Sequence, residues 1–173
     1  MAIRKCTVSD LPAVMDALAN YYRQSALYLE LSNKADAYDW YIERYTEATK
    51  QILELGMSYK QNGSFLLTVP AKAVKEKNPW LYDECFEGIY GMKEWIERET
   101  TDVIFVTGIG PKNGHVNRDI YKLFDYVCDN AEGCTVLTDA LASTFECDEF
   151  AKHSDFKRVI VVGHPYFRYG FRR

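Results

Sequence analysis

The chain has 173 residues, of which 47% are hydrophobic and 27% are charged, and its net charge is -4 at pH 7. This length and composition fit one globular domain with a sizeable core. The acidic balance does not favour a nucleic-acid partner, and the longest apolar runs are about as long as a strand, too short to cross a bilayer. No apolar stretch that could be a signal peptide follows the first five residues, so we expect a cytoplasmic protein.

The five cysteines are odd in number and form no Cys-x-x-Cys pair. We therefore expect reduced thiols that mostly fill core space. Neither the cysteines nor the three histidines have the spacing of zinc ligands, so no metal site is predicted. A cysteine nucleophile would need a histidine partner, and the sequence does not place one. The cysteines are Cys6, Cys85, Cys128, Cys134 and Cys147.

The N-terminal part predicts a strand followed by two helices. Residues 2–8 have the pattern of a strand, and Ser9-Asp10-Leu11-Pro12 is typical of a helix start with Ser9 as the cap. A second helix is predicted from about Asp36 to Leu55, with Gly56 as its stop. Tyrosines recur along one face of this helix, which favours a packed face over a ligand platform.

The next segment contains a hairpin and a region that is harder to interpret. Asn62-Gly63 between two extended segments predicts a β-hairpin, with Ser64–Val69 as its second strand. Residues 71–100 indicate one or two short helices with a small basic run, which we interpret as a solvated face. The same region could also be a lid or a partner-binding insertion.

The segment from Thr101 to Val162 predicts the central unit of the fold. A buried strand at Asp102–Thr107 leads into the loop Gly108–Asn117, and a helix with an apolar stripe follows through Asn130. A second buried strand, Cys134–Thr138, makes this a parallel, right-handed crossover. A loop between a buried strand and a helix N-terminus is a common place for a phosphate group.

The C-terminal part predicts a short helix from about Thr144 to His153 and a strand at Arg158–Val162. The tail, residues 166–173, mixes aromatic and cationic side chains. An edge strand or a protein contact explains this composition better than single-stranded nucleic acid does, given the net negative charge.

This order of elements resembles the GNAT (Gcn5-related N-acetyltransferase) superfamily. Ile3–Val14 is similar to the family's opening strand and helix start, Asp102–Asn130 to its cofactor-binding unit, and Glu149–Val159 to its closing motif. The resemblance implies an α/β (α+β) fold with a mixed, mostly antiparallel central sheet and a parallel strand–helix–strand core flanked by helices. It also implies a single domain over residues 1–173, with an insertion at about 71–100.

The resemblance further implies acetyl-CoA as the cofactor. The family holds the cofactor's pyrophosphate in a loop of pattern Arg/Gln-x-x-Gly-x-Gly/Ala, and the corresponding positions here are Pro111, Gly114 and Val116. Gly108 and Gly110 could serve instead if the loop were shifted. The candidate cofactor-binding residues are Val106, Thr107, Lys112, Asn113, Gly114, His115 and Arg118.

The resemblance does not give a complete set of catalytic residues. Family members often use a tyrosine on the last helix as general acid, and aligning Phe156 with the motif places Ala151 at that position. The candidates for a general base are Asp139 and Glu146. Each also has a structural interpretation, Asp139 as a turn or cap residue and Glu146 as a first-turn helix residue.

Two functions follow from these observations. The first is an acetyl-CoA-dependent N-acetyltransferase acting on an amine. The second is a GNAT-fold scaffold or interaction protein whose cofactor loop has decayed, since Pro111 and Val116 depart from the loop pattern. Such a chain is similar to the small acetyltransferase-like proteins of tailed phages, including virion proteins, and residues 166–173 would then contribute to homo- or hetero-oligomer contacts.

Overall fold

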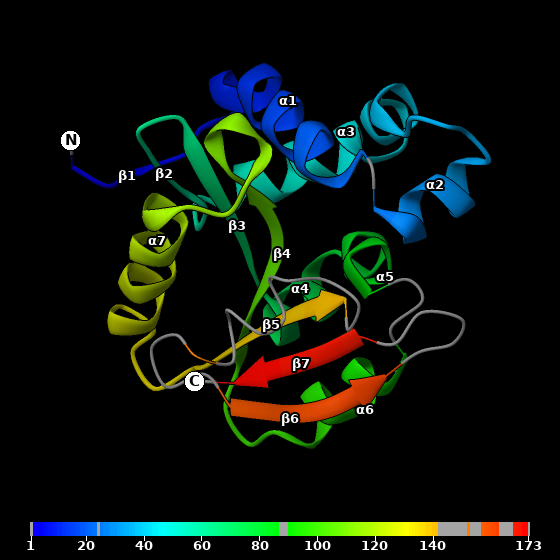
Figure 1. Ribbon diagram of the computed structural model, residues 1–173. Coiled ribbons are helices and arrows are strands. Elements are labelled where there is room, and N and C mark those ends of the chain that lie inside the picture. The colour runs from blue at the N-terminus through cyan, green and yellow to red at the C-terminus, as the bar shows by residue number, and fades with distance from the viewer. Residues whose placement is uncertain are drawn as a thin grey trace. The chain divides into compact units, whose positions relative to one another are not determined.

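Figure 1 shows the computed structural model, which describes residues 2–23, 25–86, 90–141, 152, 157–162 and 168–172. The chain divides into two compact units. The first unit comprises Met1–Leu67 and Gly108–Leu123, and the second comprises Thr68–Thr107 and Phe124–Arg173. The strand order is β1-β2-β3-β4-β5-β7-β6, and the strands β3 and β4 each contribute residues to both units.

The elements that lie wholly in the first unit are three helices, two short 3-10 turns and two short strands. They are β1 (Arg4–Lys5), η1 (Val8–Asp10), α1 (Leu11–Tyr22), α2 (Ala26–Ser32), α3 (Tyr38–Glu54), β2 (Tyr59–Gln61) and η2 (Lys112–Gly114). Three elements are shared with the second unit: β3 (Ser64–Pro70), β4 (Val103–Gly110) and α7 (Arg118–Asp129).

The start of α1 differs from the predicted one by a few residues. The predicted strand over residues 2–8 shortens to β1, and Ser9 lies inside η1 instead of capping the helix. The carboxylate of Asp10 accepts a hydrogen bond from the backbone N–H of Thr7 (2.9 Å) and one from Lys60 Nζ (2.6 Å). Asp10 therefore fixes the entry to α1 and ties it to β2, while Pro12 is tolerated in the first turn as predicted.

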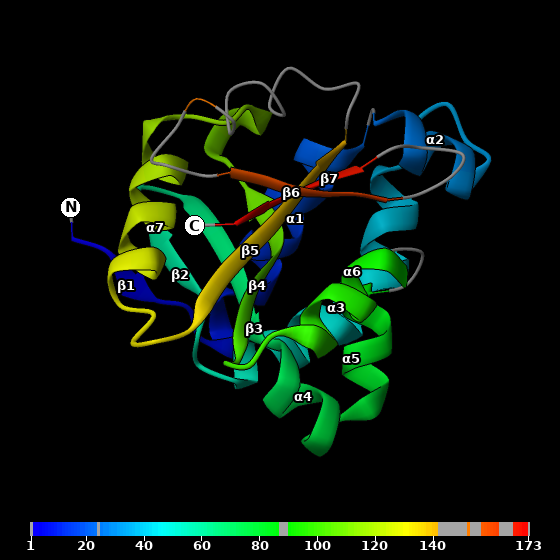
Figure 2. The same cartoon turned by 90° about the horizontal axis from the view of Figure 1, so that it is seen from below.

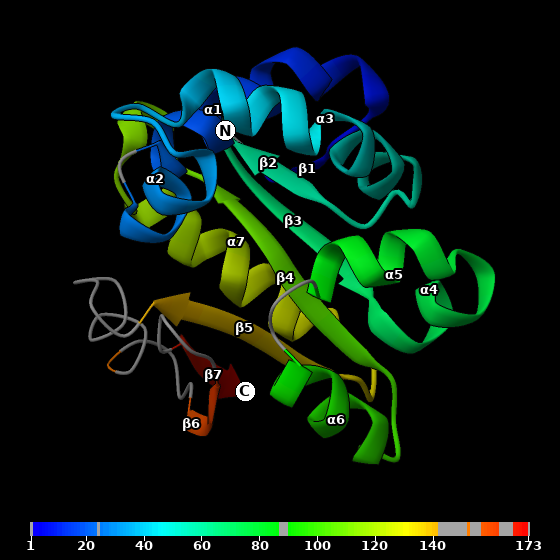
Figure 3. The same ribbon diagram turned by 90° about the vertical axis from the view of Figure 1, so that its right-hand side faces the viewer.

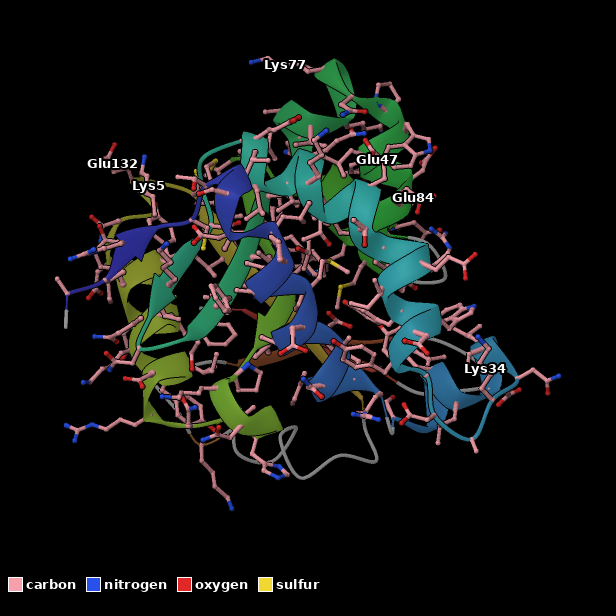
Figure 4. The ribbon with its side chains drawn as sticks, turned by 90° about the horizontal axis from the view of Figure 1, so that it is seen from above. Lys5, Lys34, Glu47, Lys77, Glu84 and Glu132 are labelled. Carbon is pink, nitrogen blue, oxygen red and sulfur yellow. The ribbon has the colours of Figure 1, made fainter. Side chains whose placement is uncertain are left out.

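Helices α1 and α3 pack against each other (Figure 1). The second predicted helix is confirmed as α3, and Gly56 follows it with φ +68°, which suits a glycine stop. Glu47 projects from the outer face of α3, whereas Tyr41 and Ile52 are buried (Figure 4). Helix α2 is not predicted; it is too short for its apolar residues to give a clear helical period. Lys34 extends away from the connection between α2 and α3.

The predicted hairpin is confirmed. Strands β2 and β3 pair antiparallel, with Gln61 opposite Ser64, so the loop contains two residues. These residues, Asn62 and Gly63, have φ of +52° and +82°. Two consecutive positive φ values are the requirement of a type I′ turn, which explains the Asn-Gly pair.

In the described part of the segment between β3 and β4 there are three helices, where one or two were expected (Figure 3). Helices α4, α5 and α6 pack on one another, and Phe86 of α5 contacts Phe105 of β4 with ring centroids 4.8 Å apart. Asp102 accepts hydrogen bonds from the backbone N–H groups of Lys72 and Val103, which joins the start of α4 to the start of β4. The helices are α4 (Ala71–Lys77), α5 (Pro79–Phe86) and α6 (Tyr90–Arg98).

The remaining strands of the second unit are β5 (Thr135–Leu141), β6 (Lys157–Val162) and β7 (Arg168–Arg172). Strands β4 and β5 pair in parallel from Val103 opposite Thr135 to Val106 opposite Thr138, which confirms the predicted crossover. Strand β7 pairs antiparallel with both β5 and β6 (Figure 2). The tail therefore forms a strand, but an interior one, so the prediction of an edge strand is wrong. The predicted helix at 144–153 lies outside the described residues apart from Lys152.

Among the described helices, none combines the length and apolar character needed to span a membrane. In the same residues, no group of three or more histidine, cysteine or acidic side chains is arranged to hold a metal ion. The cysteines of the described residues, Cys6, Cys85, Cys128 and Cys134, are free thiols. Burial raises the pKa of the Cys6 and Cys85 thiols to about 12, so neither has the reactive character of a nucleophile.

Candidate functional site

The candidate cofactor loop lies in the first unit and connects the end of β4 to the start of α7. It begins at Pro111, and the turn closes through a hydrogen bond from the Gly114 N–H to the Pro111 carbonyl (3.2 Å). Asn113 and Gly114 both have positive φ, +67° and +77°. Glycine and asparagine are the residues that tolerate this conformation best, so the local sequence accounts for the shape of the loop.

Helix α1 packs closely on the strand that leads into the loop. A Cβ atom at Gly110 would lie 3.1 Å from Ala17 Cβ, and one at Gly108 would lie 3.0 Å from Leu18 Cδ2. Both glycines therefore belong to β4 and permit helix packing, so the alternative of a shifted phosphate loop built on them is wrong. The backbone N–H of Ile109 donates to the Tyr22 hydroxyl (3.3 Å), which adds a polar tie between α1 and β4.

The hairpin turn between β2 and β3 supports the loop from the other side. The Lys112 N–H donates to Ser64 Oγ (3.0 Å), and the Asn117 side-chain amide lies 3.4 Å from the same oxygen. The Asn62 amide donates to Asp119 Oδ1 (3.1 Å). The stem of Lys112 covers Gly63, where a Cβ atom would lie 3.4 Å from Lys112 Cδ.

Asn117 is the N-cap of α7. Its Oδ1 accepts hydrogen bonds from the backbone N–H groups of Asp119 (3.0 Å) and Ile120 (3.2 Å). Two of the N–H groups that a helix leaves unpaired at its start are thus satisfied by the protein itself.

Other N–H groups of the loop have no acceptor among the described residues. They belong to residues that are half-buried or exposed. The exposed side chains of Lys112 and Arg118 add positive charge at the two ends of this row. Free backbone N–H groups next to a helix N-terminus and to cationic side chains form an arrangement that can bind a phosphate. The N–H groups are those of Asn113, His115, Val116, Asn117 and Arg118.

The structure brings five of the predicted cofactor residues together in the loop: Lys112, Asn113, Gly114, His115 and Arg118. The other two predicted cofactor residues and one predicted base belong to the second unit. Val106 is opposite Thr138 in the parallel pair, and Thr107 is the next residue of β4. Asp139 follows Thr138 in β5 and is opposite Gly170 of β7.

The position of Asp139 corrects its structural interpretation. It is a half-buried residue inside a strand and not a turn or cap residue, because β5 continues to Leu141 instead of ending at Thr138. The neighbouring Thr138 is 1% exposed, and its hydroxyl has no hydrogen-bond partner among the described residues. Glu146 and Ala151 lie outside the described residues, so their roles stay predictions.

The first unit also contains an open pocket of about 460 Å³ that sequence reasoning misses. Three aspartates face one arginine in it, so its formal charge is -2. Asp16, Asn20 and Arg23 of this pocket recur at helical spacing in and just after α1, which is the signal that could have revealed it. The lining residues are Asp16, Asn20, Arg23, Asp36, Tyr38 and Asp39.

Internal contacts organise this pocket. Arg23 forms an ion pair with Asp36, and the guanidinium holds the pKa of that carboxyl below its usual value. The Tyr38 hydroxyl donates to Asp16 Oδ1 (2.5 Å), and this hydrogen bond raises the pKa of Tyr38. The pocket thus combines an ion pair, a hydrogen-bonded tyrosine and a surplus of negative charge.

No family model matches the sequence, and no curated protein matches it. Solved structures do match the fold over almost the whole chain. An agmatine N-acetyltransferase in an apo mutant form has 12% identity and a TM-score of 0.67, with 99% of this chain and 98% of that chain covered. A polyamine N-acetyltransferase from Drosophila melanogaster has 11% identity and a TM-score of 0.66, with the same coverage.

A GNAT-family acetyltransferase from Bacillus cereus ATCC 10987 matches with 9% identity and a TM-score of 0.55, covering 99% of this chain and 95% of that chain. At these identities the likeness concerns the fold alone. The chain has the mixed α/β fold of the GNAT acetyltransferases, and the predicted fold class is confirmed.

Proposed function

We propose that the chain binds acetyl-CoA and transfers its acetyl group to an amine. The observation that carries this proposal is the loop between β4 and α7, where unpaired N–H groups lie between the cationic side chains of Lys112 and Arg118. These groups fit a pyrophosphate, because each N–H can donate to a phosphate oxygen and the helix N-terminus favours negative charge. The GNAT fold supports the same assignment.

When bound, acetyl-CoA would supply the thioester that the amine attacks. The loop residues would hold the pyrophosphate, so that the rest of the cofactor is positioned against the acceptor. Asp139 stays our candidate for the base that takes a proton from the amine, and Glu146 is the alternative.

The acceptor that we propose is a cationic amine. Two of the matching structures are described as agmatine and polyamine N-acetyltransferases. The pocket is lined by Asp16, Asp36, Asp39 and Arg23, so its formal charge is -2, which attracts cations. To test this preference, the rate at which the free thiol of CoA is released is measured with agmatine, spermidine and neutral amines as acceptors.

A single charge change in the loop tests the cofactor assignment. Asn117→Asp keeps an oxygen that can cap α7 but adds a negative charge beside the proposed phosphate site. It also replaces the amide that donates to Ser64 Oγ by a carboxylate oxygen that can accept from this hydroxyl. One added charge at a solvent-exposed site is worth about 1 kcal/mol, or about a fivefold increase in the Kd for acetyl-CoA.

Asn33→Asp is the matched control, because it makes the same charge change at the end of α2. Isothermal titration calorimetry should show weaker binding for Asn117→Asp and unchanged binding for Asn33→Asp. If the wild-type protein does not bind acetyl-CoA at millimolar concentration, the proposal is wrong.

That outcome would favour the second function, a GNAT-fold interaction protein without a cofactor, such as a virion or host-interaction component. One observation supports it: Pro111 has no N–H to donate, and Asn117 already satisfies two N–H groups of α7. This function predicts that the protein co-purifies with a protein partner. Deleting residues 166–173 does not test it, because the deletion would remove the interior strand β7 from the sheet.

A further inference from the structure

Ser64 is a completely buried polar residue whose hydroxyl touches both ends of the loop. Its side chain is 0% exposed, at the first position of β3 after the hairpin turn. Ser64 Oγ accepts the hydrogen bond from the Lys112 N–H (3.0 Å) and lies 3.4 Å from the Asn117 side-chain amide. These two contacts enclose the part of the loop that carries the unpaired N–H groups.

The position of this hydroxyl is set by the hairpin and not by the loop. Gln61 and Ser64 face each other as the last pair of β2 and β3, and the two residues between them have the positive φ values of a tight turn. A two-residue turn of this kind fixes the register of the strands. The hairpin therefore presents Ser64 Oγ at a fixed point, and the loop must adapt to it.

The contacts of Ser64 hold the loop at two points. The Lys112 N–H is directed inward to Ser64 Oγ, and Asn117 is held where its Oδ1 caps α7. The N–H groups of Asn113, His115 and Val116 lie between these two fixed points and have no acceptor among the described residues.

We propose that Ser64 is a positioning residue that holds the loop in the conformation that binds the cofactor's pyrophosphate. The inference rests on the proposed function. Ser64 does not contact the cofactor in this proposal; it acts through Lys112 and Asn117. Its effect is therefore confined to the phosphate part of the cofactor and does not extend to the acetylpantetheine arm.

This restriction defines the test. Ser64→Ala removes the hydroxyl with little change in volume, and we expect the Kd for acetyl-CoA to rise about tenfold, the effect of losing one good hydrogen bond. The Kd for S-acetylpantetheine, which lacks the pyrophosphate, should stay the same. If Ser64 had a purely structural role, Ser64→Ala would weaken the binding of both ligands equally.

Ser32→Ala is the matched control, since Ser32 is also buried in the first unit and its hydroxyl donates to the Leu29 carbonyl of α2 (3.2 Å), outside the loop. Calorimetry with both ligands is combined with amide hydrogen exchange of the ligand-free proteins. Ser64→Ala should speed exchange at Lys112 and in the following loop, and Ser32→Ala should not.

The outcomes separate the two proposals. If the wild-type protein binds acetyl-CoA but Ser64→Ala leaves both the Kd and the exchange of the loop unchanged, the inference is overturned and the proposed function stands. An equal loss of affinity for acetyl-CoA and for S-acetylpantetheine in Ser64→Ala also overturns the inference. If the wild-type protein binds no acetyl-CoA, the proposed function fails and the inference fails with it.

Discussion

Replacing Gly114 by alanine tests how strongly the loop depends on its backbone conformation. Gly114 has φ +77°, and an added Cβ atom would lie 3.7 Å from the Asn20 carbonyl oxygen, which is an ordinary contact. The cost of Gly114→Ala is therefore that of a left-handed alanine, about 1–2 kcal/mol, with no steric contribution. For a chain of this size, such a cost lowers the Tm by about 2–8 °C.

Gly56→Ala carries the same backbone cost away from the loop. Gly56 has φ +68°, and nothing lies within 4 Å of an added Cβ atom. We expect a similar fall in Tm for both variants. In Gly114→Ala, the strain can be relieved by a movement of the loop, and this movement would shift the N–H groups of His115 and Val116. In Gly56→Ala, relief of the strain does not move the loop.

The assay is the rise in Tm on adding acetyl-CoA, measured by differential scanning fluorimetry. At a ligand concentration of 100 times the Kd, binding adds about 2.7 kcal/mol, which corresponds to about 5–11 °C. Wild type and Gly56→Ala should show this rise in full, and Gly114→Ala should lose about 1–2 kcal/mol of it, or about 2–8 °C. Our reasoning is wrong if Gly114→Ala keeps the full rise, or if both variants lose it.

Two further predictions concern stability and reactivity. Burial opposes ionisation of Asp10, but hydrogen bonds from Lys60 and Thr7 outweigh this effect and lower the pKa of Asp10. The ionised carboxylate therefore stabilises the fold above the unfolded pKa of about 3.9. This stabilisation is lost as the pH falls through the lower pKa of the folded state. Asp10→Asn should therefore lower the Tm more at pH 7 than near pH 2.5; an equal loss at both pH values would contradict this. Burial raises the pKa of the Cys6 and Cys85 thiols to about 12, so neither should react with a thiol reagent at pH 8 in the native protein. Mass spectrometry locates the labelled cysteines. Rapid labelling of either residue would contradict the packing described.

The parts of the fold that the sequence predicts correctly are those with a local physical signal. Asn62-Gly63 predicts the hairpin because few other residue pairs adopt two positive φ values in succession. The apolar run at Asp102–Thr107 predicts a buried strand because a parallel strand is covered on both faces. Its end is less well predicted: β4 continues to Gly110, since the glycines taken for a loop instead allow α1 to pack closely.

Only part of the candidate site can be predicted from the sequence. Gly114 is recognisable from the family pattern, but the support of the loop by Ser64 is a contact between residues 48 positions apart and leaves no local signal. The pocket has a local signal in the helical spacing of Asp16, Asn20 and Arg23, but its contact between Asp16 and Tyr38 joins residues 22 positions apart. Such contacts depend on tertiary packing, which neither periodicity nor turn chemistry encodes.

The position of β7 has a consequence for the order in which the second unit can form during synthesis. Strand β7 follows both β5 and β6 in the chain, yet it pairs with each of them. Until Arg168–Arg172 leaves the ribosome, β5 and β6 both have an unpaired edge on the side that β7 will occupy. Unpaired edges of this kind favour association between chains, so the second unit is exposed to aggregation until β7 is inserted between β5 and β6.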